Sequence, residues 1–166
     1  VTLHGDLRLN TANTPAAARL LGLGLSDLIL SPELTIPRMR DISAALSDYG
    51  HITATAAVIY GRLPLMLLEK CVIREIADCK TCNAGRATLT DRRGMVFPVL
   101  RTPDHRNVIY NSVPTYMADA KDTLSHYRVV DWHFIFSTET SAEVEAIIDA
   151  NEKGKAPQAA VRRTSK

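Results

Sequence analysis

Residues 14–60, TPAAARLLGLGLSDLILSPELTIPRMRDISAALSDYGHITATAAVIY, decide the fold class. Apolar residues recur in this stretch first at helical spacing and then in a short continuous run, and this helix-then-strand pattern occurs twice. Thr14 is placed to cap the first helix, and Gly22 and Gly50 are placed to end the two helices. The predicted elements are a helix at Pro15–Leu23, a strand at Asp27–Leu30, a helix at Ile36–Tyr49 and a strand at His51–Tyr60.

The same alternation continues on both sides of this stretch. Val1–Leu9 has the alternating pattern of a strand. Further along the chain, the pattern predicts a helix at Pro114–Tyr127, a strand at Val129–Phe136 and a helix at Ser141–Asn151, which Ser141 caps and Gly154 closes. Because a strand followed by a crossover helix lies parallel to its neighbour, these units predict about four parallel strands.

The middle of the chain departs from this alternation. Ala87–Thr90 and Met95–Leu100 flank the turn sequence Asp91–Gly94 and predict a β-hairpin, and Val108–Asn111 predicts another strand. The expected fold class is α/β, as a partial (β/α) barrel equivalent to the second half of a TIM-like barrel, with an inserted cysteine-rich loop and the hairpin. A small doubly wound sheet is the alternative. The expected domains are a half-barrel at 1–136, carrying the loop at 71–105, and a C-terminal helix with a basic tail at 137–166.

Composition and charge name no partner. Twenty basic and 18 acidic side chains give a net charge of +2, so we expect no strong field that attracts nucleic acid or an anionic membrane. No apolar stretch approaches the roughly 20 residues that cross a bilayer, and no signal peptide opens the chain, so we expect a cytoplasmic protein without a membrane partner. Because the sequence begins with Val1 rather than Met and opens directly in strand-like sequence, we expect a piece of a longer protein or a chain whose first residues are missing.

Three cysteines form the most specific pattern in the sequence. Cys71, Cys79 and Cys82 follow the spacing C-x7-C-x2-C, and the close pair Cys79 and Cys82 suits two thiolates that bind one ion from a single turn. Zinc sites and cubane clusters usually have four ligands, and His105 is the candidate for the fourth. The alternatives are free cysteines that are simply buried and a histidine at the surface. The pattern favours an iron–sulfur cluster or a zinc ion.

Polar residues at the carboxyl ends of the predicted strands are the candidates for catalysis, because barrels carry their chemistry at that end. From these we expect Glu33, Tyr60 and Arg62 to be catalytic, although Glu33 is equally suited to cap the helix that follows it. Asp91 is better explained by a salt-bridged turn than by substrate binding. The full set of strand-end residues is Asn10, Asn13, Ser31, Glu33, Tyr60 and Arg62.

Several motifs, in this order, resemble the collagenase-like peptidase family. They are Leu3–Asp6, Leu9–Asn13, Leu30–Leu34, Tyr60–Met66, Asp91–Gly94 and Phe97–Val99. The resemblance implies the later half of that family's barrel domain, and an iron–sulfur cluster held by four cysteines in this half. Cys71, Cys79 and Cys82 match three of those cysteines, whereas the fourth is replaced within Asp104–Arg106. The resemblance therefore implies that His105 takes the fourth position, and that the activity is hydroxylation of RNA bases or quinone rings rather than proteolysis.

Two hypotheses of different classes follow. The first is an enzyme whose 4Fe–4S cluster serves oxygen-independent hydroxylation or modification of an RNA or small-molecule substrate. The second is a protease-related hydrolase or a structural module that holds zinc; for true peptide hydrolysis the sequence offers no recognisable nucleophile or catalytic dyad. An unclosed sheet also has free edges at Val1–Leu9 and Val129–Phe136. We therefore expect the partner to be the missing first half of the barrel or a second copy of the chain.

Overall fold

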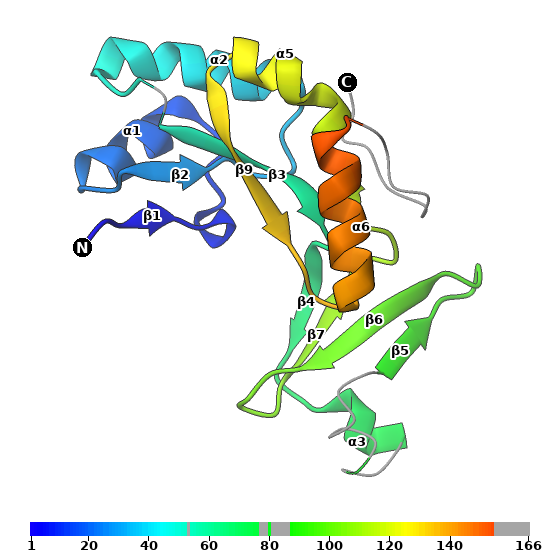
Figure 1. Ribbon diagram of the computed structural model, residues 1–166. Coiled ribbons are helices and arrows are strands. Elements are labelled where there is room, and N and C mark those ends of the chain that lie inside the picture. Colours follow the sequence, from blue (N-terminus) through cyan, green and yellow to red (C-terminus); the bar gives the residue numbers. More distant parts are fainter. Residues whose placement is uncertain (53, 77–79, 81–86, 155–166) are drawn as a thin grey trace. The chain divides into compact units, whose positions relative to one another are not determined.

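The computed structural model describes residues 1–52, 54–76, 80 and 87–154. Within them the chain forms two compact units (Figure 1). Unit 1 takes Val1–Gly61, Thr115–Phe136 and the described residues from Thr140 onward, and unit 2 takes Arg62–Pro114 and Ser137–Glu139. This division differs from the expected domains at 1–136 and 137–166, because residues 62–114 and 137–139 form a unit of their own and the C-terminal helix groups with the parallel sheet. Positions 155–166 of the expected basic tail lie outside the described residues, as do positions 77–79 and 81–86 of the expected cysteine-rich loop, which include Cys79 and Cys82.

A parallel sheet forms the centre of unit 1. Its strands are β1 (His4–Gly5), β2 (Asp27–Ile29), β3 (Thr55–Gly61) and β9 (Val129–Ile135), and they lie in the order β1, β2, β3, β9 with every neighbouring pair parallel (Figure 1). The short strand β8 (Thr115–Tyr116) pairs antiparallel with the end of β3. The predicted mixed α/β class and the predicted parallel pairing are confirmed.

Helices cover one face of this sheet. They are α1 (Thr14–Gly22), α2 (Ile36–Leu46) and α5 (Lys121–His126). Apolar side chains of these helices pack on alternate residues of the strands, as a half-buried sheet requires. The fully buried members of this core include Ala17, Leu28, Met39, Leu46, Ala57, Ile59 and Leu124. Among the described residues, none of the helices combines the length and apolar composition that crossing a membrane requires.

The predicted strand at Val1–Leu9 is wrong over most of its length. β1 spans His4–Gly5 alone, and a 3-10 helix, η1 (Leu7–Leu9), follows it. The reason is the side chain of Asp6, whose Oδ1 accepts a hydrogen bond of 2.6 Å from the N–H of Leu7. Short polar side chains compete in this way with extended pairing.

The predicted helix at Pro114–Tyr127 is correct only in its second half. Thr115 and Tyr116 form β8, a 3-10 helix, η3 (Ala118–Ala120), follows, and α5 begins at Lys121. Tyr116 is 1% exposed and pairs with Tyr60 of β3. Burial of this ring against the sheet overrides the helical spacing of the segment.

Two predicted helix caps are each displaced by one residue. Asn13, and not Thr14, caps α1, because its Oδ1 accepts a hydrogen bond of 2.9 Å from the N–H of Ala16. Helix α6 (Ser141–Glu152) is capped by Thr140 rather than by Ser141. The predicted helix at Ile36–Tyr49 is α2 followed by a 3-10 turn, η2 (Ser47–Tyr49).

Unit 2 is built on an antiparallel sheet. Its strands β4 (Pro64–Leu68), β5 (Ala87–Thr90), β6 (Val96–Arg101) and β7 (Asn107–Tyr110) lie in the order β4, β7, β6, β5. The predicted hairpin and the strand after it are confirmed as β5, β6 and β7. A short helix, α3 (Val72–Ile76), lies where the sequence indicated only a loop, and the core of the unit is formed by Ile73, Val99 and Ile109.

Candidate functional site

The four predicted ligands divide into two that the structure describes and two that it does not. Cys71 and His105 are described, whereas Cys79 and Cys82 lie outside the described residues. Among the described positions, no group of three or more His, Cys, Asp and Glu side chains is arranged to hold a metal ion. The structure therefore defines the separate surroundings of Cys71 and of His105, but not those of Cys79 and Cys82.

Cys71 lies between the end of β4 and the start of α3. It is half-buried and packs against the core of unit 2. The residues on both sides of it contact the segment that follows His105: Glu69 Oε2 is 3.1 Å from Arg106 Nε, and the N–H of Val72 donates to Asn107 Oδ1 at 2.7 Å. The structure thus brings together the two chain segments that carry Cys71 and His105.

His105 lies in the turn between β6 and β7. The turn is closed by hydrogen bonds from the N–H of Thr102 to the carbonyl oxygen of Arg106, at 2.9 Å, and from the N–H of His105 to the carbonyl oxygen of Thr102, at 3.1 Å. His105 has φ of +63°, in the left-handed region that favours glycine. A histidine in this conformation costs free energy, and such costs are concentrated at functional positions.

Charged groups surround this turn. Arg106 Nε contacts Asp104 Oδ2 at 3.0 Å in addition to Glu69, and Arg101 Nη1 is 3.5 Å from His105 Nδ1. The hydroxyl of Thr102 donates to the Asp104 carboxylate, and this hydrogen bond is the main reason why the pKa of Asp104 lies below its usual value. Asp104 is therefore an anion at neutral pH.

Arg62 does not extend into solvent as a free strand-end cation. Its Nη1 donates to the carbonyl oxygens of Asn111, at 3.0 Å, and of Ser112. Its Nε lies 4.0 Å from Oε1 of Glu139, and the two side chains are 21% and 6% exposed. Glu139 in turn accepts hydrogen bonds from the N–H groups of Ser137 and Thr138, at 2.7 and 2.9 Å. The result is a mostly buried polar cluster within unit 2.

Sequence reasoning missed Ser137 and Glu139 as members of this cluster. They follow β9, and Arg62 follows β3, and the two strands pair in the register Gly61 to Ile135. The signal in the sequence was the run Ser-Thr-Glu-Thr directly after the predicted strand, where polar residues at the carboxyl end of a parallel strand are expected.

The other two predicted catalytic residues lie in different surroundings. Glu33 is exposed, and the capping position of α2 is Thr35, so the alternative role of Glu33 as the helix cap is wrong. Tyr60 is 4% exposed and packs with Tyr116 and Ile147, and its ring centroid lies 5.6 Å from that of Phe136. The structure does not bring Glu33 and Tyr60 into one cluster by any contact that it describes.

The remaining strand-end residues have local structural roles. Asn10 closes η1 in the left-handed conformation, with φ of +46°. Asn13 caps α1, and Ser31, 1% exposed, accepts a hydrogen bond of 3.4 Å from the N–H of Glu33 through its hydroxyl. The side chains of Asn13 and Ser31 therefore satisfy nearby backbone N–H groups, whereas Asn10 acts through its own N–H, which donates to the carbonyl oxygen of Leu7 at 3.0 Å.

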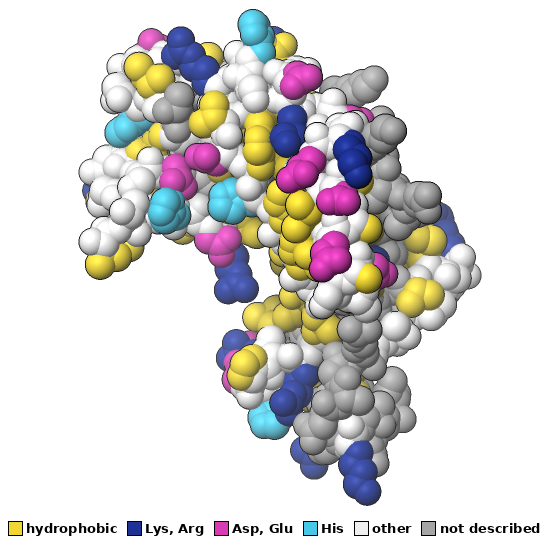
Figure 2. Space-filling model, viewed as in Figure 1, with side chains coloured by type: hydrophobic (Ala, Val, Ile, Leu, Met, Phe, Trp, Pro, Cys, Tyr) yellow, Lys and Arg dark blue, Asp and Glu magenta, His cyan; other side chains and the backbone are white. Residues whose placement is uncertain are grey.

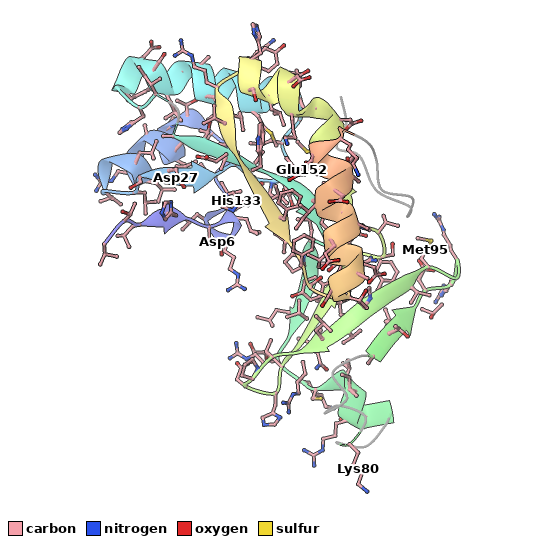
Figure 3. The ribbon with its side chains drawn as sticks, viewed as in Figure 1. Asp6, Asp27, Lys80, Met95, His133 and Glu152 are labelled. Carbon is pink, nitrogen blue, oxygen red and sulfur yellow. The ribbon has the colours of Figure 1, made fainter. Side chains whose placement is uncertain are left out.

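The second face of the unit 1 sheet carries polar residues that were not among the candidate site residues predicted from the sequence. Ala56 and Val58 of β3 lie on this face, and their partners in β9 are Asp131 and His133. In β1 and β2, His4 Nδ1 contacts Asp27 Oδ2 at 2.6 Å. Figure 2 shows histidine and acidic side chains near one another on this face, and Figure 3 labels Asp27 and His133. The alternation of polar and apolar residues in β9 was the available signal.

Scans against models of protein families, curated proteins and solved structures each found no match. No relative therefore indicates which of these residues are functional.

Proposed function

We propose that this chain is the later half of a (β/α)-barrel enzyme similar to the collagenase-like peptidases, and that it holds a 4Fe–4S cluster through Cys71, Cys79, Cys82 and His105. The observation that carries the proposal is the contact between the segments of Cys71 and His105, through Glu69 with Arg106 and Val72 with Asn107. It supports a shared site because ligands far apart in sequence must lie on segments that are held together.

The donor set fits the group. Three thiolates and one imidazole are ligands for iron–sulfur clusters and for zinc, and a histidine in place of a cysteine raises the reduction potential of clusters that have it. When bound, the cluster would supply electron transfer for oxygen-independent hydroxylation of an RNA base or a quinone ring.

The half-barrel part of the proposal is supported by the parallel strands of unit 1. Four neighbouring parallel strands with helices packed on one face are what half of a (β/α) barrel contains. In such an arrangement Arg62 and Tyr60 follow or end β3 at the carboxyl edge, and Glu33 follows β2. We assign to Arg62 the role of binding an oxygen of the substrate, since it follows β3 directly and its side chain is 21% exposed.

The alternative is a zinc-binding module, either structural or related to hydrolases. It is favoured by the same donor set, since zinc accepts three thiolates and one histidine. Anaerobic purification followed by analysis of iron, acid-labile sulfide and zinc separates the two. A brown protein that contains iron and sulfide in equal amounts supports the cluster, and a colourless protein with one zinc supports the alternative. Cleavage of casein that survives stringent purification and disappears on replacement of Glu33 would instead restore the peptidase reading.

A further inference from the structure

A buried asparagine links the backbone next to Cys71 with the backbone next to His105. Asn107, the first residue of β7, is 0% exposed. Its Oδ1 accepts hydrogen bonds from the N–H of Val72, at 2.7 Å, and of Ile73, at 3.5 Å, and its Nδ2 donates to the carbonyl oxygen of Arg106, at 3.1 Å. A buried amide is costly unless both of its ends are satisfied, and here both are.

The position of Asn107 in the sheet explains why it reaches both segments. β7 lies between β4 and β6, and Asn107 pairs with Leu68 on one side and with Arg101 on the other. The chain leaves β4 after Leu68 and reaches Cys71 three residues later, while His105 lies two residues before Asn107. One side chain therefore fixes the chain immediately after Cys71 relative to the turn that holds His105.

The hydrogen bonds from Val72 and Ile73 to Asn107 take the place of partners that α3 lacks within itself. The first N–H groups of any helix have no partner within the helix, and Val72 and Ile73 begin α3. Asn107 satisfies them from another strand, so the conformation of the residue before them, Cys71, depends on a contact that is distant in sequence. Ligands of metal sites are held in place by such outer contacts, and loss of one typically weakens metal binding by about 10- to 100-fold.

We propose that Asn107 is a positioning residue of the metal site, which holds the backbone of Cys71 in register with the turn of His105. The inference rests on the proposed function, since it takes Cys71 and His105 as ligands. Asn107 itself is not a ligand, and its amide acts through the backbone of Val72.

The test compares the affinity of the wild-type chain and its variants for Co²⁺. Bound metal is first removed under anaerobic conditions, and Co²⁺ binding is then measured by the thiolate-to-metal absorption. Asn107→Asp keeps an acceptor oxygen for both N–H groups but loses the donor to the carbonyl oxygen of Arg106, so it is expected to bind Co²⁺ less tightly than wild type and more tightly than Asn107→Leu. Asn107→Leu keeps the volume but removes the acceptor, and is expected to bind about 10- to 100-fold more weakly. Asn111→Leu is the matched control, because Asn111 is also buried in unit 2, at 8% exposure, and is expected to leave the affinity unchanged.

The outcomes separate this inference from the function on which it rests. Wild-type affinity in the folded Asn107→Leu variant, or equal losses in Asn107→Asp and Asn107→Leu, would overturn the positioning role while the metal site stands. If Asn107→Leu does not fold by circular dichroism, Asn107→Ala takes its place in the comparison, with the same expected loss. A wild-type chain that binds neither Co²⁺ nor a cluster contradicts the proposed function and removes the inference with it.

Discussion

Arg62 Nε lies 4.0 Å from Glu139 Oε1, so the residue that follows β3 meets a carboxylate that follows β9. Arg62 also donates to the carbonyl oxygens of Asn111 and Ser112, and it thus ties together three separate segments of unit 2. Its Nε and the hydroxyl of Ser137 are buried without a hydrogen-bond partner. The guanidinium group is therefore a structural tie, and only the exposed fifth of the side chain is accessible to a substrate oxygen.

Replacement of Arg62 by Leu is expected to lower the free energy of unfolding by about 2 kcal/mol, since the carboxylate of Glu139 then stays buried without its counter-charge. The value lies below the usual loss for a buried pair because the side chain is one-fifth exposed and the separation is long. Urea unfolding measures it. Arg8→Leu serves as the control, because the pair of Arg8 with Asp6 is 3.9 Å apart and largely exposed, and it is expected to cost less than about 0.5 kcal/mol. Equal losses in the two variants would contradict the role of Arg62 as a tie.

The cysteine ligands are tested by single replacements. Cys79→Ser and Cys82→Ser are each expected to abolish bound iron or zinc and to lower the thermal midpoint, because binding of a structural metal is coupled to folding. Metal analysis and thermal melting of anaerobically purified protein give both results. Unchanged metal content in both variants would exclude these cysteines as ligands.

His105 allows a test in which stability and metal affinity move in opposite directions. His105→Gly places glycine at a φ of +63°, where it is favoured, and is expected to stabilise the metal-free protein by up to about 1 kcal/mol. The same change removes a ligand and is expected to weaken metal binding, leaving three thiolates and water. His105→Ala is the comparison, since it removes the imidazole without relieving the backbone. Full retention of affinity in both variants would remove His105 from the site.

The alternation of strand and helix was predictable because it follows from local patterns that the structure keeps. The strands at Asp27–Ile29 and Val129–Ile135 lie within one residue of their expected bounds, whereas Thr55–Gly61 begins four residues later than expected. What local patterns did not reveal is pairing between distant segments. Thr115–Tyr116 has helical spacing in sequence and becomes a strand because Tyr116 is buried against Tyr60.

The candidate site shows the same difference between local patterns, which were predictable, and contacts between distant residues, which were not. The spacing of Cys71, Cys79 and Cys82 is local and could be read directly, whereas the contact of Asn107 with the N–H of Val72 spans 35 positions and has no signature in the sequence. Glu139 was missed for a similar reason, since its partner Arg62 lies on the far side of the hairpin region. Asp91 was placed correctly in a turn, but its carboxylate accepts the N–H groups of Arg93 and Met95 instead of forming a salt bridge there.

The hydroxyls of Thr140 and Ser141 are neighbours at the start of α6, but only that of Thr140 caps the helix. The hydroxyl of Thr140 accepts the N–H of Glu143 at 3.4 Å, and Glu143 Oε2 accepts the N–H of Thr140 at 2.7 Å, so the two form a capping box. Thr140→Ala is expected to cost about 1 kcal/mol of stability. Ser141→Ala, at the position that the sequence favoured, is expected to change little. Urea unfolding of the two variants decides, and a larger loss for Ser141→Ala would show that the cap is assigned to the wrong residue.

Free sheet edges in unit 1 predict association. Within the described part of the chain, β1 pairs only with β2 and β9 pairs only with β3, so each has an edge without a neighbouring strand. β1 has two residues and β9 has seven. The edge of β9 therefore offers far more backbone for pairing than the edge of β1, although the sequence predicted a long strand at both places. Apolar surface buried by a partner contributes about 25 cal/mol for each Å² removed from water.

We therefore expect light scattering at micromolar concentration to show a dimer, or a complex when the first half of a barrel is supplied. Val130→Lys on β9 is expected to weaken association, because lysine on an edge strand opposes pairing with another chain. Ile148→Lys is the matched control: Ile148 is 39% exposed, as Val130 is, but it lies on α6 and not on a sheet edge. A stable monomer that binds no hydrophobic dye, or equal effects of the two lysines, would show that the edge of β9 is not where a partner pairs.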